Sequence, residues 1–231
     1  MDRNMTTHNL DLPAGGEVHA GRYGRIRIHG DATLDDDAQF DVLDVHGSIV
    51  AHNVNGGVLV VDGAMRATGS LHVGTLGGNG AVDVEGAMRV GRMQFTGVLT
   101  ADRTLRVLRS LDLSGILRNP QRIDADSVDV DGFVEVADLH AVGAVNIHPL
   151  ETMMLSWTCF RQFDHGSTAD SISCTDLDAK DLACPLIRAH TVTLRGSSFA
   201  QDVTCTKTLS LDRSSVALQV TGNCERIRLA G

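Results

Sequence analysis

The feature that most constrains this chain is a short pattern, apolar-x-apolar-x-Gly, that recurs with a nearly constant spacing. Leu43, Val45 and Gly47 form one clear copy. Seven consecutive copies close at Gly30, Gly47, Gly63, Gly80, Gly97, Gly115 and Gly132, so successive corners lie 17, 16, 17, 17, 18 and 17 positions apart. A fixed period of this length is typical of solenoids, in which each repeat is one turn that stacks on the next.

A second run of alternating apolar residues follows the glycine in each period. Before the next copy begins, Val82 and Val84 are followed by Met88 and Val90. Alternation with a period of two indicates a strand that buries one face, and about three such strands fit into one period. Glycine suits the corners between them because it accepts a positive φ without steric cost. The sequence therefore predicts an all-β fold, a single-stranded, three-sided β-helix (β-solenoid) with about 17 residues per turn.

The composition is compatible with such a coil. Apolar residues make up 42% of the chain but aromatic residues only 3%, so small aliphatic side chains must fill the interior. About five inward side chains, at about 2 kcal/mol each, do not offset the ordering entropy of one turn, so many turns must stack. The 231 residues would give about 12 turns in a rod roughly 55 Å long.

The frame of the repeat changes once. One step of 17 beyond Gly132 falls on Pro149, and the pattern is clear again only at Gly196. Extrapolation backwards from there reaches Leu177 and then Phe160. We therefore expect an N-terminal tail (1–16), a first solenoid block (17–149), a register break (150–167) and a second block (168–231) that continues the same rod. Around Trp157 the spacing fits either a short amphipathic helix or a further strand, and the extrapolation to Phe160 favours the strand.

The two ends of the predicted rod carry little cover. The unit from Ile227 to Gly231 is in repeat phase, and the segment 1–16 offers only Leu10 and Leu12 as apolar cover. An uncapped solenoid end is a template for another, because it exposes apolar surface and unpaired backbone groups. We therefore expect end-to-end polymerisation into a homo-oligomer or filament. Alternatively, the segment 1–16 covers one end and assembly stops at a dimer, or the rod stays monomeric. The expected interface residues are Tyr23, Ile26, Ile28, Ile227 and Leu229.

Charge and motifs narrow the function. The net charge of −9 argues against a nucleic-acid partner, because phosphate binding needs clustered Lys and Arg. No apolar run is long enough for a membrane-spanning helix and the start lacks a signal-peptide pattern, so we expect a cytoplasmic protein. The sequence has no G-x-S-x-G, H-E-x-x-H, phosphate-loop or CxxC motif. We therefore expect no enzymatic activity, no cofactor and no small-molecule substrate.

Three groups of residues that could bind ions remain as alternatives to plain structure. His29 and His46 each precede a corner glycine and should stack on each other, and Asp62 comes next in the same column. Two histidines and a carboxylate could bind zinc. We favour the interpretation that this is a column of exposed polar corner residues. The acidic run 35–37 is interpreted as a solvated turn before a cation site. The five cysteines are expected to be reduced and buried: Cys159, Cys174, Cys184, Cys205 and Cys224.

Stretches such as VLDVHGSIVAHNVNGGVLVVDGAM and AVDVEGAMRVGRMQFTGVLTADRTLRV resemble the bactofilins, a family of bacterial cytoskeletal proteins. The resemblance covers residues 24–147 well and 172–231 less well, and no family residue can be carried over by motif. It implies a right-handed, three-sided β-helix that polymerises end to end without nucleotide. It also implies a scaffold for cell-shape, cell-wall, envelope or motility machinery, often at the inner face of the membrane, with envelope or membrane proteins as further partners. The two-block chain looks more like longer, polymer-forming relatives of that family.

Two other classes of β-helix fit less well. Hexapeptide acyltransferases keep an aliphatic residue at every sixth position and build each turn from three hexapeptides, which this sequence does not do. Carbohydrate-cleaving β-helices have longer turns with large loops, whereas the steps here vary by only one position. A non-polymerising β-helix that binds envelope proteins or polysaccharide along its faces remains the main alternative.

Overall fold

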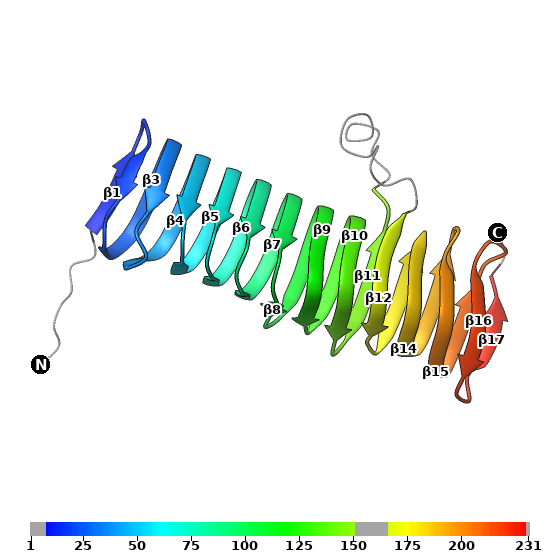
Figure 1. Ribbon diagram of the computed structural model, residues 1–231. Helices are drawn as coiled ribbons and strands as arrows, with labels where there is room; N and C mark the ends of the chain where they lie inside the picture. Colours follow the sequence, from blue (N-terminus) through cyan, green and yellow to red (C-terminus); the bar gives the residue numbers. More distant parts are fainter. Residues whose placement is uncertain (1–7, 151–165, 230–231) are drawn as a thin grey trace, which may run out of the picture.

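The computed structural model describes residues 8–150 and 166–229. These residues form one sheet of 17 parallel strands that coils into a β-solenoid of about 12 turns, and the strands follow the rod in chain order (Figure 1). The strands are β1 (His8–Leu12), β2 (Gly16–Val18), β3 (Gly21–Leu34), β4 (Ala38–Ala51), β5 (Val54–Ala67), β6 (Leu71–Val84), β7 (Met88–Ala101), β8 (Leu105–Val107), β9 (Ser110–Ala125), β10 (Ser127–Ala141), β11 (Ala144–His148), β12 (Ser167–Ser173), β13 (Asp176–Lys180), β14 (Leu182–Arg195), β15 (Phe199–Leu211), β16 (Val216–Thr221) and β17 (Glu225–Arg228).

Each coil of the rod has three sides, and each side turns a pair of side chains inward. We number the sides in chain order from the one that precedes the corner glycine. In one coil the inward pairs are Leu59 and Val61 on side 1, Met65 and Ala67 on side 2, and Leu71 and Val73 on side 3. The alternation of apolar and polar residues in the sequence is therefore confirmed as the alternation of inward and outward positions.

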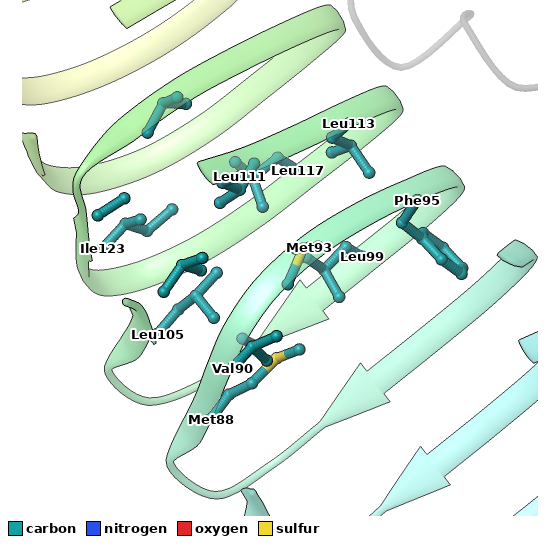
Figure 2. Close-up of a cluster of buried hydrophobic side chains, with 14 of the residues drawn as sticks. Met88, Val90, Met93, Phe95, Leu99, Leu105, Leu111, Leu113, Leu117 and Ile123 are labelled. Atoms are coloured by element: carbon teal, nitrogen blue, oxygen red, sulfur yellow. The ribbon is translucent and has the colours of Figure 1, made fainter. Parts of the chain in front are cut away.

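The interior consists of columns in which each residue lies over its counterpart in the next coil. Leu43 pairs with Ile26 on one side and Leu59 on the other, and none of the three side chains has exposed surface. Figure 2 shows the columns in the middle of the rod, where Met93 and Leu111 are neighbours. Burial of each such side chain contributes about 2 kcal/mol, so the stability of a coil depends on having neighbours.

The predicted glycine corners are confirmed. The seven glycines from Gly30 to Gly132 lie between side 1 and side 2 and all have positive φ, between 97° and 158°. Each also lies against the backbone of the coil below. A Cβ on Gly63 would collide with the carbonyl oxygen of Gly47, so the column needs glycine for space as well as for conformation.

The predicted break is an insertion at a single corner of an otherwise continuous rod. Val145 of β11 pairs directly with Leu177 of β13, so the coil expected at Phe160 is not interposed between them and that prediction is wrong. From Ile147 on side 1 to Ser167 on side 2 the chain takes 20 positions, where the other corners between these sides take three or four. Extrapolation by 17 failed because it assumed equal corners. The helix-or-strand question around Trp157 lies outside the described residues.

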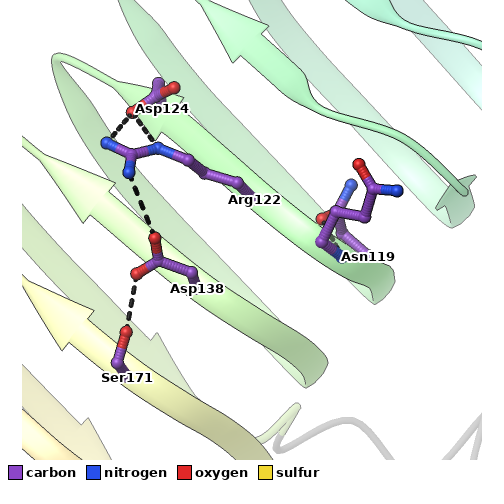
Figure 3. Close-up of polar contacts among 6 residues, drawn as sticks. Asn119, Arg122, Asp124, Asp138 and Ser171 are labelled. Atoms are coloured by element: carbon purple, nitrogen blue, oxygen red, sulfur yellow. Dashed lines mark hydrogen bonds and ion pairs between the residues drawn. The ribbon is translucent and has the colours of Figure 1, made fainter.

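Polar contacts carry the rod across this insertion. On side 3 the Arg122 guanidinium binds Asp124 at 2.8 Å and Asp138 at 3.3 Å, and the Ser171 hydroxyl donates to Asp138 at 2.6 Å (Figure 3). These residues belong to β9, β10 and β12. The row therefore ties the coils before the insertion to those after it.

Asn119 is fully buried on side 2, and its amide donates to the carbonyl oxygens of two residues in the coil below.

Candidate functional site at the two terminal coils

The first coil begins earlier than predicted. Leu10 and Leu12 of β1 pair with Ile26 and Ile28 of β3, and β2 continues the same turn. The prediction that residues 1–16 form a tail is therefore wrong for residues 8–16. Ile26 and Ile28 belong to the second coil and have no exposed surface, so they do not form the end of the rod. A step of 16 positions from Leu10 to Ile26 was the available signal, and the displaced corner glycine, Gly15, concealed it.

Tyr23, another of the expected interface residues, lies in the first coil. Its ring is half-buried on side 3, and its hydroxyl donates to the carbonyl oxygen of His19 at 3.0 Å. It borders an open hollow of about 290 Å³ that Phe40 and Gln39 also line. With Leu10 and Leu12, which are also half-buried, Tyr23 makes the first coil an apolar surface.

The last coil, formed by β16 and β17, has the opposite character. Arg226 pairs with Leu209 and Arg228 with Leu211, so arginines occupy the inward column of side 1. Both arginines are exposed, and Nη1 of Arg228 donates to the carbonyl oxygen of Asp212 at 3.0 Å. Inward-pointing charges at a sheet edge oppose the addition of another strand.

The predicted register of this coil is wrong by one residue. Ile227 pairs with Ser210, points outward and is 39% exposed. Leu229 follows β17 half-buried, and its N–H donates to the carbonyl oxygen of Leu211 at 2.8 Å. The prediction took a step of 18 from Leu209 to Ile227, whereas the backbone takes 17. A shift of one residue exchanges the two faces of a strand, which is why an arginine lies where an isoleucine was expected.

Asp212 anchors the last coil at its corner. Its carboxylate accepts hydrogen bonds from the N–H groups of Gly196 at 2.7 Å, Ser215 at 2.8 Å and Ser214 at 3.1 Å. Hydrogen bonding with the Ser215 side chain contributes most to lowering the pKa of Asp212 below its usual value, followed by the N–H groups of Gly196 and Ser215 and the Ser214 side chain. At neutral pH the ionised carboxylate therefore holds the corner that leads into β16.

The histidine column has the predicted arrangement. The rings of His29 and His46 stack with centroids 5.1 Å apart, and Nδ1 of His46 lies 3.6 Å from a carboxylate oxygen of Asp62. Nε2 of His46 lies 3.1 Å from Asp44. Across residues 8–150 and 166–229, no three His, Cys, Asp or Glu side chains converge in a way that could hold a metal ion. The column is thus described by ring stacking between neighbouring coils and by contacts of His46 with the carboxylates of Asp44 and Asp62.

The acidic run is a hydrogen-bonded turn. Asp36 accepts the N–H of Asn53 at 2.7 Å, and Asp35 accepts the N–H of Asp37 at 3.1 Å. Asn53 in turn accepts the N–H of Ser70 at 2.9 Å. The same kind of corner therefore repeats from coil to coil, which agrees with the turn interpretation.

The four described cysteines are free thiols, and Cys159 lies outside the described residues. Cys184 and Cys205 are buried, whereas Cys174 and Cys224 are half-buried, so the predicted burial is confirmed for two of them. Burial raises the pKa of the thiols of Cys174 and Cys184 to about 12. Few thiolates therefore form near neutral pH, and these two groups are poor nucleophiles.

One polar hollow went unnoticed in the sequence. The column before the corner brings Asp131, His148, Lys180, Arg195 and Asp212 together beside the insertion, around an open space of about 750 Å³. In the sequence each of these residues lies at the same place relative to its corner, which could have indicated that they share a column. The insertion concealed that His148 and Lys180 are neighbours in this column.

Comparison of the chain with protein-family models, with curated proteins and with solved structures gives no match. Among the described residues no helix is long and apolar enough to cross a membrane.

Proposed function

We propose that this chain is a structural, self-assembling scaffold of the bactofilin kind, whose copies join through the ends of the rod without nucleotide. The observation that carries the proposal is the apolar first coil. Leu10 and Leu12 stand in the same columns as the fully buried Ile26 and Ile28, yet they are only half-buried. A second copy over this coil would complete their burial, contributing roughly 1 kcal/mol per leucine, and would pair the edge of β1 that no other described strand pairs.

The chemistry of the two ends selects how copies meet. A head-to-tail contact would set Arg226 and Arg228 against Leu10 and Leu12. Burial of an arginine without a partner costs several kcal/mol, roughly what the leucines gain or more. A contact between two first coils places apolar surface on apolar surface and has two-fold symmetry, the commonest closed arrangement. The proposed unit is therefore a head-to-head pair, and longer assemblies need a second contact elsewhere on the rod.

The wider role follows from the resemblance of the repeat to bactofilins. We place the scaffold in the cytoplasm, at the inner face of the membrane, where it would support cell-shape, envelope or motility machinery together with envelope proteins. The absence of a phosphate-loop motif in the sequence supports assembly without nucleotide. No cofactor and no enzymatic step is part of this proposal.

Negative-stain microscopy and light scattering of the purified chain, without nucleotide, test the end contact. The wild type should form rods twice the length of a single copy, or longer assemblies. The double variant Leu10→Asp/Leu12→Asp should form no end-to-end pairs, because two carboxylates cannot be stacked on two others. Ile227→Asp, a single apolar-to-acidic change at the last coil, should leave the length distribution unchanged. Wild-type rods that never join end to end at any concentration, or end-to-end pairs in the double variant, would contradict the proposal and favour a binding module instead.

A further inference from the structure

A continuous ridge runs along the corner between side 3 and side 1. It comprises residues 89–92, 106–109, 124–129, 141–143 and 174–176, each range from a successive coil. Backbone hydrogen bonds join the coils along it: the N–H of Asp126 donates to the carbonyl oxygen of Arg109, that of Gly143 to Asp126, and that of Thr175 to Gly143. The ridge is therefore a rigid edge with coils about 4.8 Å apart.

One half of the ridge is basic. Arg89 and Arg106 occupy neighbouring positions in register, and Arg109 lies one corner position further on. All three are exposed, and in the described part of the chain their side chains form no ion pair or hydrogen bond. Arg92 has only a long contact, 3.9 Å, with Asp112. Like charges stacked in adjacent coils repel each other, so carboxylates of a partner that bind this half would relieve the repulsion.

The other half is acidic. Asp126, Asp129 and Asp176 are exposed on the next coils, and across the described residues their carboxylates accept no hydrogen bond and form no ion pair. Asp124 differs, because Arg122 of the same chain already binds it (Figure 3). Two apolar side chains are exposed along the ridge: Leu108, at 42% exposure, lies beside Arg109 where the halves meet, and Val142, at 68%, lies one coil beyond Asp126.

The sequence shows that the two halves belong to larger bands of charge. The segment 89–122 contains seven arginines and two aspartates. The described part of the segment 124–181 contains ten Asp and Glu side chains and, among Lys and Arg, only Lys180. The net charge of −9 conceals this segregation, and it also conceals a basic surface that the argument from net charge had excluded.

We infer that the ridge is a lateral contact surface for a second copy of this chain, in which two rods lie antiparallel and the arginine half of each meets the aspartate half of the other. A two-fold axis near the junction of Arg109 and Asp126 sets Arg106 and Arg109 of each copy against Asp126 and Asp129 of the other, with Leu108 near the centre. This contact does not depend on the ends of the rod, and it would supply the second contact that growth beyond a head-to-head pair requires.

The alternation of sign selects a second copy over other partners. An anionic membrane or a nucleic acid would be attracted by Arg106 and Arg109, but Asp126 lies only one coil away, about 5 Å, and Asp129 beside it. This is within the screening length of about 8 Å at physiological salt, so attraction and repulsion would largely cancel. A surface that carries both signs in sequence is matched by its own inverted copy, because each attraction then occurs twice.

Charge reversal on both halves tests the inference. The full chain with Leu10→Asp/Leu12→Asp, which removes the end contact, is the background for sedimentation velocity at low salt. It should dimerise, and its dissociation constant should rise about tenfold between low and physiological salt, as expected for screened ion pairs. Arg106→Glu/Arg109→Glu and Asp126→Arg/Asp129→Arg should each be monomeric. Mixed in equal amounts, these two variants should form a heterodimer, because the four positions around the axis are then all acidic in one variant and all basic in the other.

The double variant Arg103→Glu/Arg213→Glu is the matched control, since it makes the same change of charge at exposed positions off the ridge, and it should dimerise as the background does. All four ridge substitutions together exchange the signs on either side of the two-fold axis and should restore the dimer. A background that stays monomeric at low salt, or opposite variants that do not associate on mixing, would overturn the inference without affecting the end contact. If the wild-type rods join end to end but never pair laterally, the first coil is the sole contact between copies.

Discussion

At the first coil of the rod two leucines, Leu10 and Leu12, cover the side 1 column, whereas at the last coil two arginines, Arg226 and Arg228, cover it. The backbone pairs in the same parallel manner at both ends. The difference teaches that the ladder of hydrogen bonds carries the coil onward irrespective of side chain, and that side-chain chemistry decides whether the coil accepts a further neighbour.

The two ends are also held by different forces. Packing holds the first coil, through leucines that sit on fully buried isoleucines. Hydrogen bonds hold the last coil, through the carboxylate of Asp212 and through Arg228, which reaches the Asp212 carbonyl oxygen. Changes to apolar size should therefore matter most near the first coil, and changes to charge and pH most near the last.

The largest expected effect compares equal truncations near the two ends. Ile28→Ala removes a fully buried side chain and should lower the free energy of unfolding by about 2–5 kcal/mol. Ile227→Ala removes an outward side chain and should change it by about 0.5 kcal/mol or less. Urea unfolding followed by circular dichroism measures both. Equal losses in the two variants would mean that Ile227 is packed as predicted from the sequence and that the register of β17 is wrong.

The next effect tests whether the arginines limit association. Arg226→Leu/Arg228→Leu gives the last coil the same inward pair as the first, so it should create a new end contact and lengthen the assemblies seen by light scattering. Arg226→Lys/Arg228→Lys keeps the charge and is the control that should not lengthen them. Should the leucine variant keep the wild-type length distribution, the arginines would not be what blunts this end.

How far the sequence predicts the fold depends on the length of the corners. Wherever successive corners lie 16 to 18 positions apart, as from Gly30 to Gly132, the inward columns and the glycine corners follow from the sequence alone, because each coil repeats the last. The same rhythm cannot locate an insertion. From Ile147 to Ser167 one corner takes 20 positions, and extrapolation placed a coil at Phe160 that the pairing of β11 with β13 leaves no room for.

The candidate site was harder to predict than the fold. At each end a single missing or added residue decides which side chain faces inward, and apolar rhythm alone favoured Ile227 over Arg226. Tertiary pairing overrode that preference, because the backbone keeps a step of 17 from Leu209 even where this brings a charge into the column. The ridge was hidden for another reason: its charges come from separate coils, and only the stacking of the coils places Arg109 beside Asp126.

The smallest expected effect concerns the anchor of the last coil. Asp212→Asn removes a charged acceptor of three backbone hydrogen bonds, which should cost about 1 kcal/mol locally and speed hydrogen exchange in β16 about fivefold. Because the folded state lowers the pKa of Asp212 below the ordinary value of 3.8, its contribution is fully present at neutral pH. It should be lost as the pH falls below about 4 and through the lower pKa of the folded state.

Hydrogen exchange followed by mass spectrometry checks this at neutral pH and near pH 3, with β5 as the internal reference. In the wild type, opening of β16 relative to β5 should increase on acidification, and in Asp212→Asn this acid-dependent part should be absent because no carboxylate remains to be protonated. Asp202→Asn is the matched control, since Asp202 lies in the adjoining strand β15 and its carboxylate accepts no hydrogen bond among the described residues. If β16 opens equally in both variants, packing and not Asp212 holds the last coil. The packing would be that of Val216 and Ala217 on their partners Phe199 and Ala200. The contrast between a packed first coil and a hydrogen-bonded last coil would then have to be abandoned.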